Sequence, residues 1–145
     1  MELIIDFFKD LDRLGPGSDE QTLKALHLMQ LNENDLNIID MGCGTGSQTL
    51  TLARATGKEI TAIDCIEPFL NTLRHRFNEE GLNVKASKAD MSKLQYRKRE
   101  FDVIWSEGSI YFIGFNRGIG YWYQFLKPKG YLALTDIMAY RLTPR

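Results

Sequence analysis

The sequence predicts an α/β fold in which a doubly wound, mainly parallel β-sheet is covered by helices on both faces. From residue 36 onward, short apolar segments with strand character alternate with longer segments that have helical periodicity. This alternation is typical of parallel sheets whose strands are joined by right-handed helical crossovers. A glycine-rich stretch at residues 38–50, IIDMGCGTGSQTL, connects the first predicted strand to the helix after it. Because ligands bind at such loops in parallel sheets, the fold class also predicts where a site lies.

Two helices are predicted before the alternating part of the chain. Residues 2–14 place apolar side chains at helical spacing, and the Gly-Pro-Gly segment at 15–17 ends that helix. A second helix is expected from Ser18 to about Leu31, because Ser18 and Gln21 match the spacing of a capping box. A loop is predicted at residues 32–35, which read NEND.

The remaining elements follow in strict alternation. Strands are expected at residues 36–41, 59–64, 83–88, 101–106 and 131–137. Helices are expected at residues 47–56, 68–80 and 117–126. Pro68 fits the first turn of its helix, and Gly81 fits the end of the same helix. The KPKG segment at 127–130 predicts a turn that leads into the last strand.

Composition and charge describe an ordinary globular domain. The chain has 145 residues, of which 43% are hydrophobic and 26% charged, and its formal net charge is -1. No apolar run approaches the ~20 residues that span a bilayer, and the N-terminus lacks the features of a signal peptide. Cys43 and Cys65 are too few for a disulfide framework. We therefore expect a cytoplasmic protein with no membrane partner, and the charge argues against a nucleic-acid partner.

Known loop patterns compete for the glycine-rich stretch. Ser47 stands where a phosphate-binding P-loop needs lysine and where a dinucleotide-binding fingerprint needs glycine. A tight turn without a ligand is the structural alternative. What remains is a Gly-x-Gly-x-Gly pattern, formed by Gly42, Gly44 and Gly46 and preceded by Asp40. Glycine at these positions permits positive φ and lets a ligand approach the backbone.

Later segments decide between these patterns. Asp40-Met-Gly-Cys-Gly-Thr-Gly resembles motif I of the class I S-adenosylmethionine-dependent methyltransferases, and Asp90-Met91 resembles their adenine site. Asp64 ends the second predicted strand, where a carboxylate can accept hydrogen bonds from both hydroxyls of a ribose. Residues 101–110, FDVIWSEGSI, and 126–136, LKPKGYLALTD, resemble the fourth-strand motif and the lead into the fifth strand. The resemblance extends from Leu14 to Ile137. It implies a Rossmann-like fold and methyl transfer from S-adenosylmethionine to a small-molecule acceptor.

The resemblance also implies roles for individual residues. For the cofactor, these are Asp40, Gly42, Cys43, Gly44 and Gly46 at the methionine part, Asp64 at the ribose, Cys65, Ile66, Asp90 and Met91 at the adenine, and Ser106 near the methyl group. Transfer from a sulfonium needs mainly alignment and exclusion of water, so a catalytic base is optional. Glu107 is the best acid for orienting or deprotonating an acceptor, and Tyr111 is the next candidate. A structural acid or a helix cap is an equal alternative for Glu107.

Other functions stay open on sequence alone. A NAD(P)-dependent oxidoreductase would also use Gly42, Gly44 and Asp64, although Ser47 opposes it. A non-catalytic cofactor-binding module is a third class. Cys43 and Cys65 follow neighbouring predicted strands, but two small apolar fillers are more common than a metal pair, and we expect no metal site.

The end of the family pattern is unmatched. Class I methyltransferases usually carry seven strands, whereas this chain stops at Arg145, soon after the fifth. We therefore expect strand order 3-2-1-4-5 with the last two family strands missing. Residues 1–34 would form the N-terminal helices and residues 35–145 the cofactor-binding core of one shortened domain. The fifth strand would then be an exposed edge through which the protein could self-associate.

Overall fold

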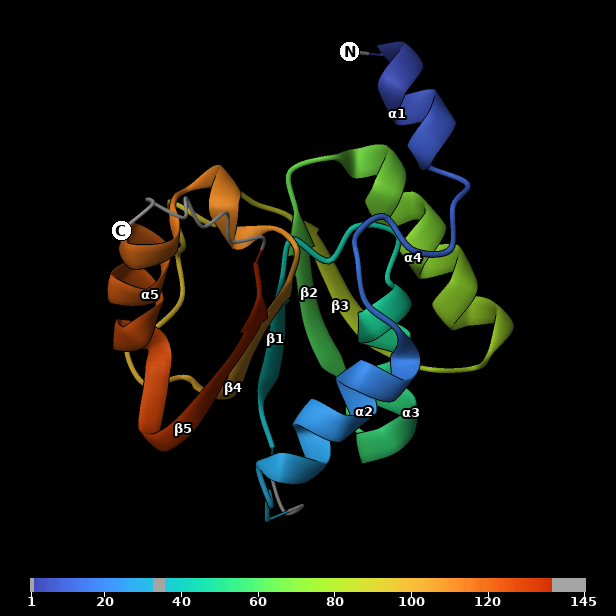
Figure 1. The fold of residues 1–145 in the computed structure, drawn as a ribbon. Helices are drawn as coiled ribbons and strands as arrows, with labels where there is room; N and C mark the ends of the chain where they lie inside the picture. Colours follow the sequence, from blue (N-terminus) through green and yellow to red (C-terminus); the bar gives the residue numbers. More distant parts are fainter. Residues whose placement is uncertain (1, 33–35, 137–145) are drawn as a thin grey trace, which may run out of the picture.

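The centre of the molecule is a five-stranded parallel sheet with the order β3-β2-β1-β4-β5 (Figure 1). The computed structural model describes residues 2–32 and 36–136. The strands are β1 (Ile38–Met41), β2 (Ile60–Asp64), β3 (Val84–Lys88), β4 (Phe101–Glu107) and β5 (Leu126–Thr135). The predicted fold class and strand order are confirmed.

Helices cover both faces of this sheet (Figure 1). The described helices are α1 (Glu2–Phe8), which stands apart from the sheet, α2 (Asp19–Leu28), α3 (Ser47–Thr56), α4 (Glu67–Glu79) and α5 (Phe115–Trp122), with short 3₁₀ helices η1 (Ile110–Phe112) and η2 (Tyr123–Phe125). Helices α2, α3 and α4 lie on one face, and α5 lies on the other. Among residues 2–32 and 36–136, no helix is both long enough and apolar enough to cross a membrane.

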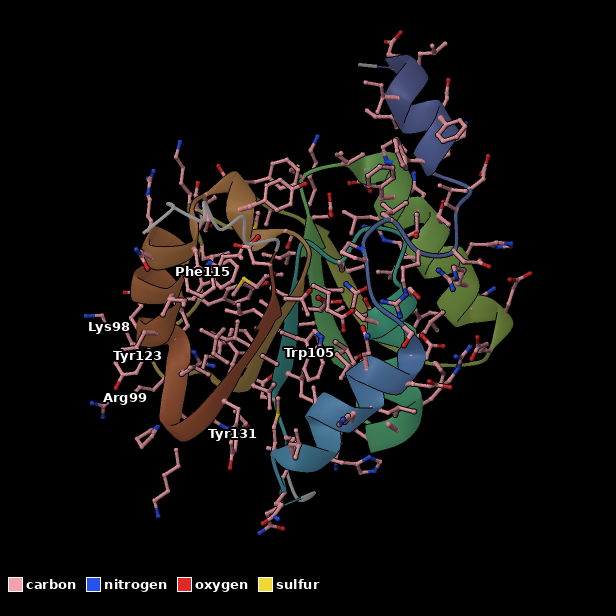
Figure 2. All side chains as sticks on the ribbon, in the orientation of Figure 1. Lys98, Arg99, Trp105, Phe115, Tyr123 and Tyr131 are labelled. Carbon is pink, nitrogen blue, oxygen red and sulfur yellow. The ribbon has the colours of Figure 1, made fainter. Side chains whose placement is uncertain are left out.

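The core has two parts because successive strand residues point to opposite faces. Ile38 and Trp105 belong to the cluster that includes α3 and α4, and Trp105 lies on the α2 side of the sheet (Figure 2). Ile39 and Ile104 belong to the cluster on the α5 side, where Trp122 is fully buried. Burial on both faces explains why β1 and β4 are apolar runs rather than alternating patterns.

The first helix is shorter than predicted. It ends at Phe8 instead of residue 14, and the chain continues as an irregular N-terminal strap, residues 9–17. Side chains from distant segments donate hydrogen bonds to the strap's carbonyl oxygens, each at 2.8 Å. Thr72 Oγ1 donates to the Lys9 carbonyl, Thr45 Oγ1 to the Leu11 carbonyl and Arg76 Nη1 to the Asp12 carbonyl. These bonds hold the strap against α4 and the glycine loop, which favours an extended path over a continued helix.

The start of α2 is confirmed. Ser18 caps it by accepting a hydrogen bond from the Gln21 backbone N–H at 3.3 Å. The helix ends at Leu28, three residues before the predicted end. The predicted 32–35 loop lies largely outside the described residues, as does Ile137 at the predicted end of β5.

The KPKG segment is not a turn before β5, as predicted, but a bulge within it. Leu126 pairs with Phe101, and Tyr131 pairs with Val103, so the four residues between them lie opposite Asp102 alone. Local turn signals cannot distinguish a bulge from a turn, since both use glycine and proline. The helix predicted at 117–126 is also displaced: α5 ends at Trp122, and η2 follows it.

Candidate active site

A cavity of about 710 Å³ lies at the carboxyl edge of the sheet, beside the loop that follows β1. Strand β1 pairs with β2 on one side and with β4 on the other, so the strand order reverses at β1. Among the predicted site residues, those that line the cavity are Gly42, Gly44, Asp64, Cys65, Ile66, Asp90, Met91, Glu107 and Tyr111. Asp40, Cys43, Gly46 and Ser106 do not line it.

Each glycine of the loop meets a different constraint. The backbone φ angles are 71° at Gly42, 54° at Gly44 and 89° at Gly46, a region that residues with a side chain rarely adopt. A Cβ on Gly42 would lie 2.6 Å from the Ser109 Cβ, and one on Gly46 would lie 2.6 Å from the Leu73 Cγ. Gly42 and Gly44 therefore let Ser109 and Leu14 pack directly against the loop, whereas Gly46 lets α3 start close against α4.

Asp40 lies beneath the loop and is fully buried. Its carboxylate accepts hydrogen bonds from Thr49 Oγ1 at 2.6 Å and from Gln48 Nε2 at 3.4 Å, which join β1 to the first turn of α3. Burial raises its pKa from 3.8 to about 7, against the lowering effect of these bonds. Asp40 thus supports the loop from below without reaching the cavity.

Asp64, at the end of β2, joins the loop to the cavity wall. Its carboxylate accepts hydrogen bonds from the Gly44 N–H and the Ile66 N–H, both at 2.9 Å. Burial raises its pKa, and the backbone bonds oppose that shift. The Asp64 carboxylate lines the cavity, so the arrangement fits a ribose whose two hydroxyls lie side by side.

The next wall of the cavity comes from the turn after β3. Asp90 accepts hydrogen bonds from the Ser92 N–H at 2.8 Å and Ser92 Oγ at 2.6 Å, and these bonds lower its pKa. The Met91 carbonyl accepts from Trp122 Nε1 at 2.9 Å, which ties this turn to α5. Phe69, on α4, completes this end of the cavity and was missed from sequence because its helical spacing is that of an ordinary core residue.

Ser106 and Cys43 lie behind the cavity wall. Ser109 Oγ donates to the Met41 carbonyl at 2.8 Å and lies 2.8 Å from Ser106 Oγ, so Ser106 is the donor in that second bond. Ser109, rather than Ser106, lines the cavity. Cys43 is buried, which raises the pKa of its thiol well above its usual value, whereas Cys65 is exposed and lines the cavity. A buried, protonated Cys43 fits the role of a small apolar filler.

Glu107 is held by three donors. Its carboxylate accepts hydrogen bonds from Arg13 Nη1 at 2.9 Å, Thr22 Oγ1 at 2.6 Å and Trp105 Nε1 at 2.9 Å. The Glu107 side chain is 8% exposed, and Arg13 also pairs with Asp19. Both oxygens of Glu107 are therefore engaged, Oε2 by Arg13 of the strap and Oε1 by Thr22 of α2 and Trp105 of β4, which favours the structural role that the sequence left open. Within residues 2–32 and 36–136, no group of three or more His, Cys, Asp and Glu side chains could hold a metal ion.

The N-terminal residues of the site could not be foreseen. Ile4, Ile5 and Phe8 of α1, with Leu14 and Gly15 of the strap, line the cavity although they precede the sheet. A Cβ on Gly44 would lie 2.9 Å from Leu14 Cδ1, so the strap closes directly over the glycine loop. The apolar spacing of residues 2–14 predicted a helix, but nothing local to that segment indicates which part of the fold it covers.

The residues present fit S-adenosylmethionine. The cavity wall at Gly42 and Gly44 suits a ligand part without phosphate, since the described residues that line the cavity include no arginine or lysine. Asp64 suits the ribose, and Asp90 suits the amine of an adenine that lies beside Ile66 and Met91. The two carboxylates are hydrogen-bond acceptors, and they match the hydroxyl and amine donors of a nucleoside.

Comparison with known proteins agrees with this fit. A family model described as a methyltransferase domain matches residues 38–130. The methyltransferase GfsG of Streptomyces halstedii is 33% identical over 131 residues, which cover 88% of this chain and 47% of that protein. The demethylmenaquinone methyltransferase of Thermus thermophilus is 29% identical over 83% of this chain and 56% of its own. The chain thus spans about half the length of these relatives.

Solved structures share the fold. Phosphoethanolamine N-methyltransferase 2 of Haemonchus contortus, in complex with S-adenosyl-L-methionine, superimposes with a TM-score of 0.75 and 20% identity, over 91% of this chain and 31% of that one. The cyclase SpnF gives a TM-score of 0.72 and 28% identity, over 86% and 48%. Because the family model matches more than half of the sequence, the chain belongs to the methyltransferase domain family.

Proposed function

We propose that the protein transfers the methyl group of S-adenosylmethionine to a small-molecule acceptor. The observation that carries the proposal is the single cavity wall that Gly42, Gly44, Asp64 and Asp90 form at the strand-order switch. Bound there, the cofactor supplies a methyl group on a sulfonium, which already has a good leaving group. The protein then has to align the acceptor and exclude water.

Each side chain has a role in this proposal. Asp64 binds the ribose hydroxyls and orients the Gly44 N–H by accepting its hydrogen bond. Asp90 and Met91 contact the edge of the adenine. Glu107 acts as a positioning residue, since it fixes the strap through Arg13 and so keeps Leu14 over the glycine loop. Tyr111, which is 51% exposed at the cavity mouth, is the candidate for a direct contact with the acceptor.

Calorimetric titration with S-adenosylmethionine, S-adenosylhomocysteine and NAD tests the cofactor assignment. We expect the first two to bind and NAD to show no binding. Asp64→Ala should weaken binding by roughly 1.5–3 kcal/mol, about ten- to 150-fold, because hydrogen bonds to a charged group are lost. Glu59→Ala is the matched control, since Glu59 lies just before the opposite end of the same strand and pairs with Lys85. Equal affinity in the Asp64 variant would remove this residue from the site.

A second candidate function comes from the name of one structural neighbour. SpnF is named a cyclase, so this fold does not by itself imply methyl transfer. A cyclase or a non-catalytic module would bind the cofactor without consuming it. Release of S-adenosylhomocysteine in the presence of candidate acceptors distinguishes turnover from binding alone.

Self-association and a cytoplasmic location complete the proposal. In the described sheet, β5 pairs only with β4, and Tyr131 on β5 is 42% exposed. Tyr123, 74% exposed, lies with Lys98 and Arg99 at the outer end of the sheet, separate from Tyr131 (Figure 2). An unpaired edge of this kind supports pairing with another chain, which sedimentation velocity would detect as a dimer. The unpaired cysteines Cys43 and Cys65 support a reducing compartment.

A further inference from the structure

The cavity extends beyond the residues assigned to the cofactor. Its outer part is lined by Ile4, Ile5 and Phe8 of α1, and by Tyr111, Phe112 and Ile113 at η1. These two segments are far apart in sequence, and both line this cavity. All six side chains are apolar apart from the Tyr111 phenol.

Several of these side chains face solvent. Helix α1 has no buried residue, Ile4 is 62% exposed, and Phe112 is 71% exposed. Ile5 and Phe8 are half-buried and turn toward the cavity, whereas Phe7 is 70% exposed and does not line it. Apolar side chains gathered around an open cavity gain stability when an apolar ligand covers them.

The charges of the lining argue against a charged acceptor. Its acidic residues are Asp64, Asp90 and Glu107, of which Glu107 is paired with Arg13, and the described part of the lining holds no lysine or arginine of its own. An anion would meet like charge in a partly desolvated site, which is unfavourable.

A cation would also find little to bind. Glu107 is engaged by Arg13, Thr22 and Trp105. Asp64 and Asp90 accept hydrogen bonds from Gly44, Ile66 and Ser92, and the proposed function uses both carboxylates to hold the cofactor. The described lining therefore offers an ammonium group no free carboxylate near α1.

We propose that the methyl acceptor is an uncharged, largely apolar molecule that binds between α1 and η1, with Phe8 and Phe112 against its apolar body. The inference rests on the proposed methyltransferase function, because it assigns the other part of the cavity to the cofactor. It names the acceptor's chemistry: an aromatic or alicyclic ring system with no phosphate, carboxylate or ammonium group.

Three probes that share a naphthalene ring system but differ in charge test this inference. The full chain is saturated with S-adenosylhomocysteine and titrated with 2-naphthol, 2-naphthyl phosphate and 2-naphthylmethylamine, and the ring fluorescence is followed. We expect 2-naphthol to bind at least about tenfold more tightly than either charged probe. Phe8→Ala should weaken 2-naphthol binding about tenfold through lost apolar contact, while S-adenosylhomocysteine binding stays unchanged.

Phe7→Ala is the matched control. It changes the same residue type at the next position of the same helix, but its side chain is not part of the lining, so we expect 2-naphthol affinity to stay within about twofold of the parent value. Tighter binding of the phosphate or the amine, no binding of 2-naphthol, or equal effects of the two Phe variants would each overturn the inference. Failure of S-adenosylhomocysteine itself to bind would overturn the proposed function, so the two failures are distinguishable.

Discussion

Replacing Asp40 with asparagine should remove a large pH dependence of stability. Asp40 is fully buried beneath the glycine loop, and burial raises its pKa from 3.8 to about 7. The native state therefore keeps a proton in a pH range where the unfolded chain has released it. For a group whose folded pKa is raised, the stability contribution is full below the unfolded pKa and is lost as pH rises through the folded pKa. The free energy of unfolding should thus fall between about pH 4 and about pH 7.

The size of this effect follows from the two pKa values. At about 1.4 kcal/mol per pH unit, a rise from 3.8 to about 7 corresponds to roughly 4 kcal/mol. Asparagine has nearly the same shape and does not ionise, so the variant should lack this part of the pH dependence. Changed hydrogen bonding to Thr49 and Gln48 adds a constant difference in the free energy of unfolding between the two proteins. This difference does not vary with pH, whereas the contribution from ionisation of Asp40 does.

Urea unfolding of the two proteins from about pH 4 to about pH 8 measures the difference. Other titrating groups, including Asp64 with its raised pKa, are present in both proteins, so they largely cancel in the comparison. Asp6→Asn serves as the control, because Asp6 is an exposed acid on α1. A pH dependence that is the same in the Asp40 variant as in the parent would refute the argument from burial.

Two further substitutions test the packing of the site. Glu107→Gln should lower the free energy of unfolding by about 1.5–3 kcal/mol, because the charged hydrogen bond with Arg13 is lost. Urea unfolding measures this loss, and equal stability of the Glu107→Gln variant and the parent would contradict a structural role for Glu107. Gly46→Ala should cost about 2–5 kcal/mol, since φ is 89° and the new Cβ would meet Leu73. Gly57→Ala has φ of 65° and open space, so it should cost only ~1–2 kcal/mol; equal losses would contradict the steric argument.

Much of the fold and of the site was predictable because its signals are local. Apolar runs alternating with helical periodicity predict a parallel sheet, and that prediction holds for β1 to β5. The positive φ of Gly42 and Gly44 could be expected because they follow a buried strand within a few residues. The carboxyl ends of parallel strands meet at one edge of the sheet, which placed Asp64 at the ligand side, and the family resemblance placed Asp90 there; both line the cavity.

What the sequence by itself determined is therefore the parallel sheet and the wall of the cavity that the loops after the strands form, while the family resemblance supplied the strand order. Only the tertiary structure decided that α1 ends at Phe8, that the strap closes over Gly44, and that Glu107 is engaged by Arg13. These features depend on contacts between segments that are far apart in the chain, such as the 94 positions between Arg13 and Glu107. Periodicity, capping and turn signals describe a residue's immediate neighbours along the chain. They carry no information about which distant donor will compete for a carbonyl or a carboxylate, so the outer half of the site had to come from the folded molecule.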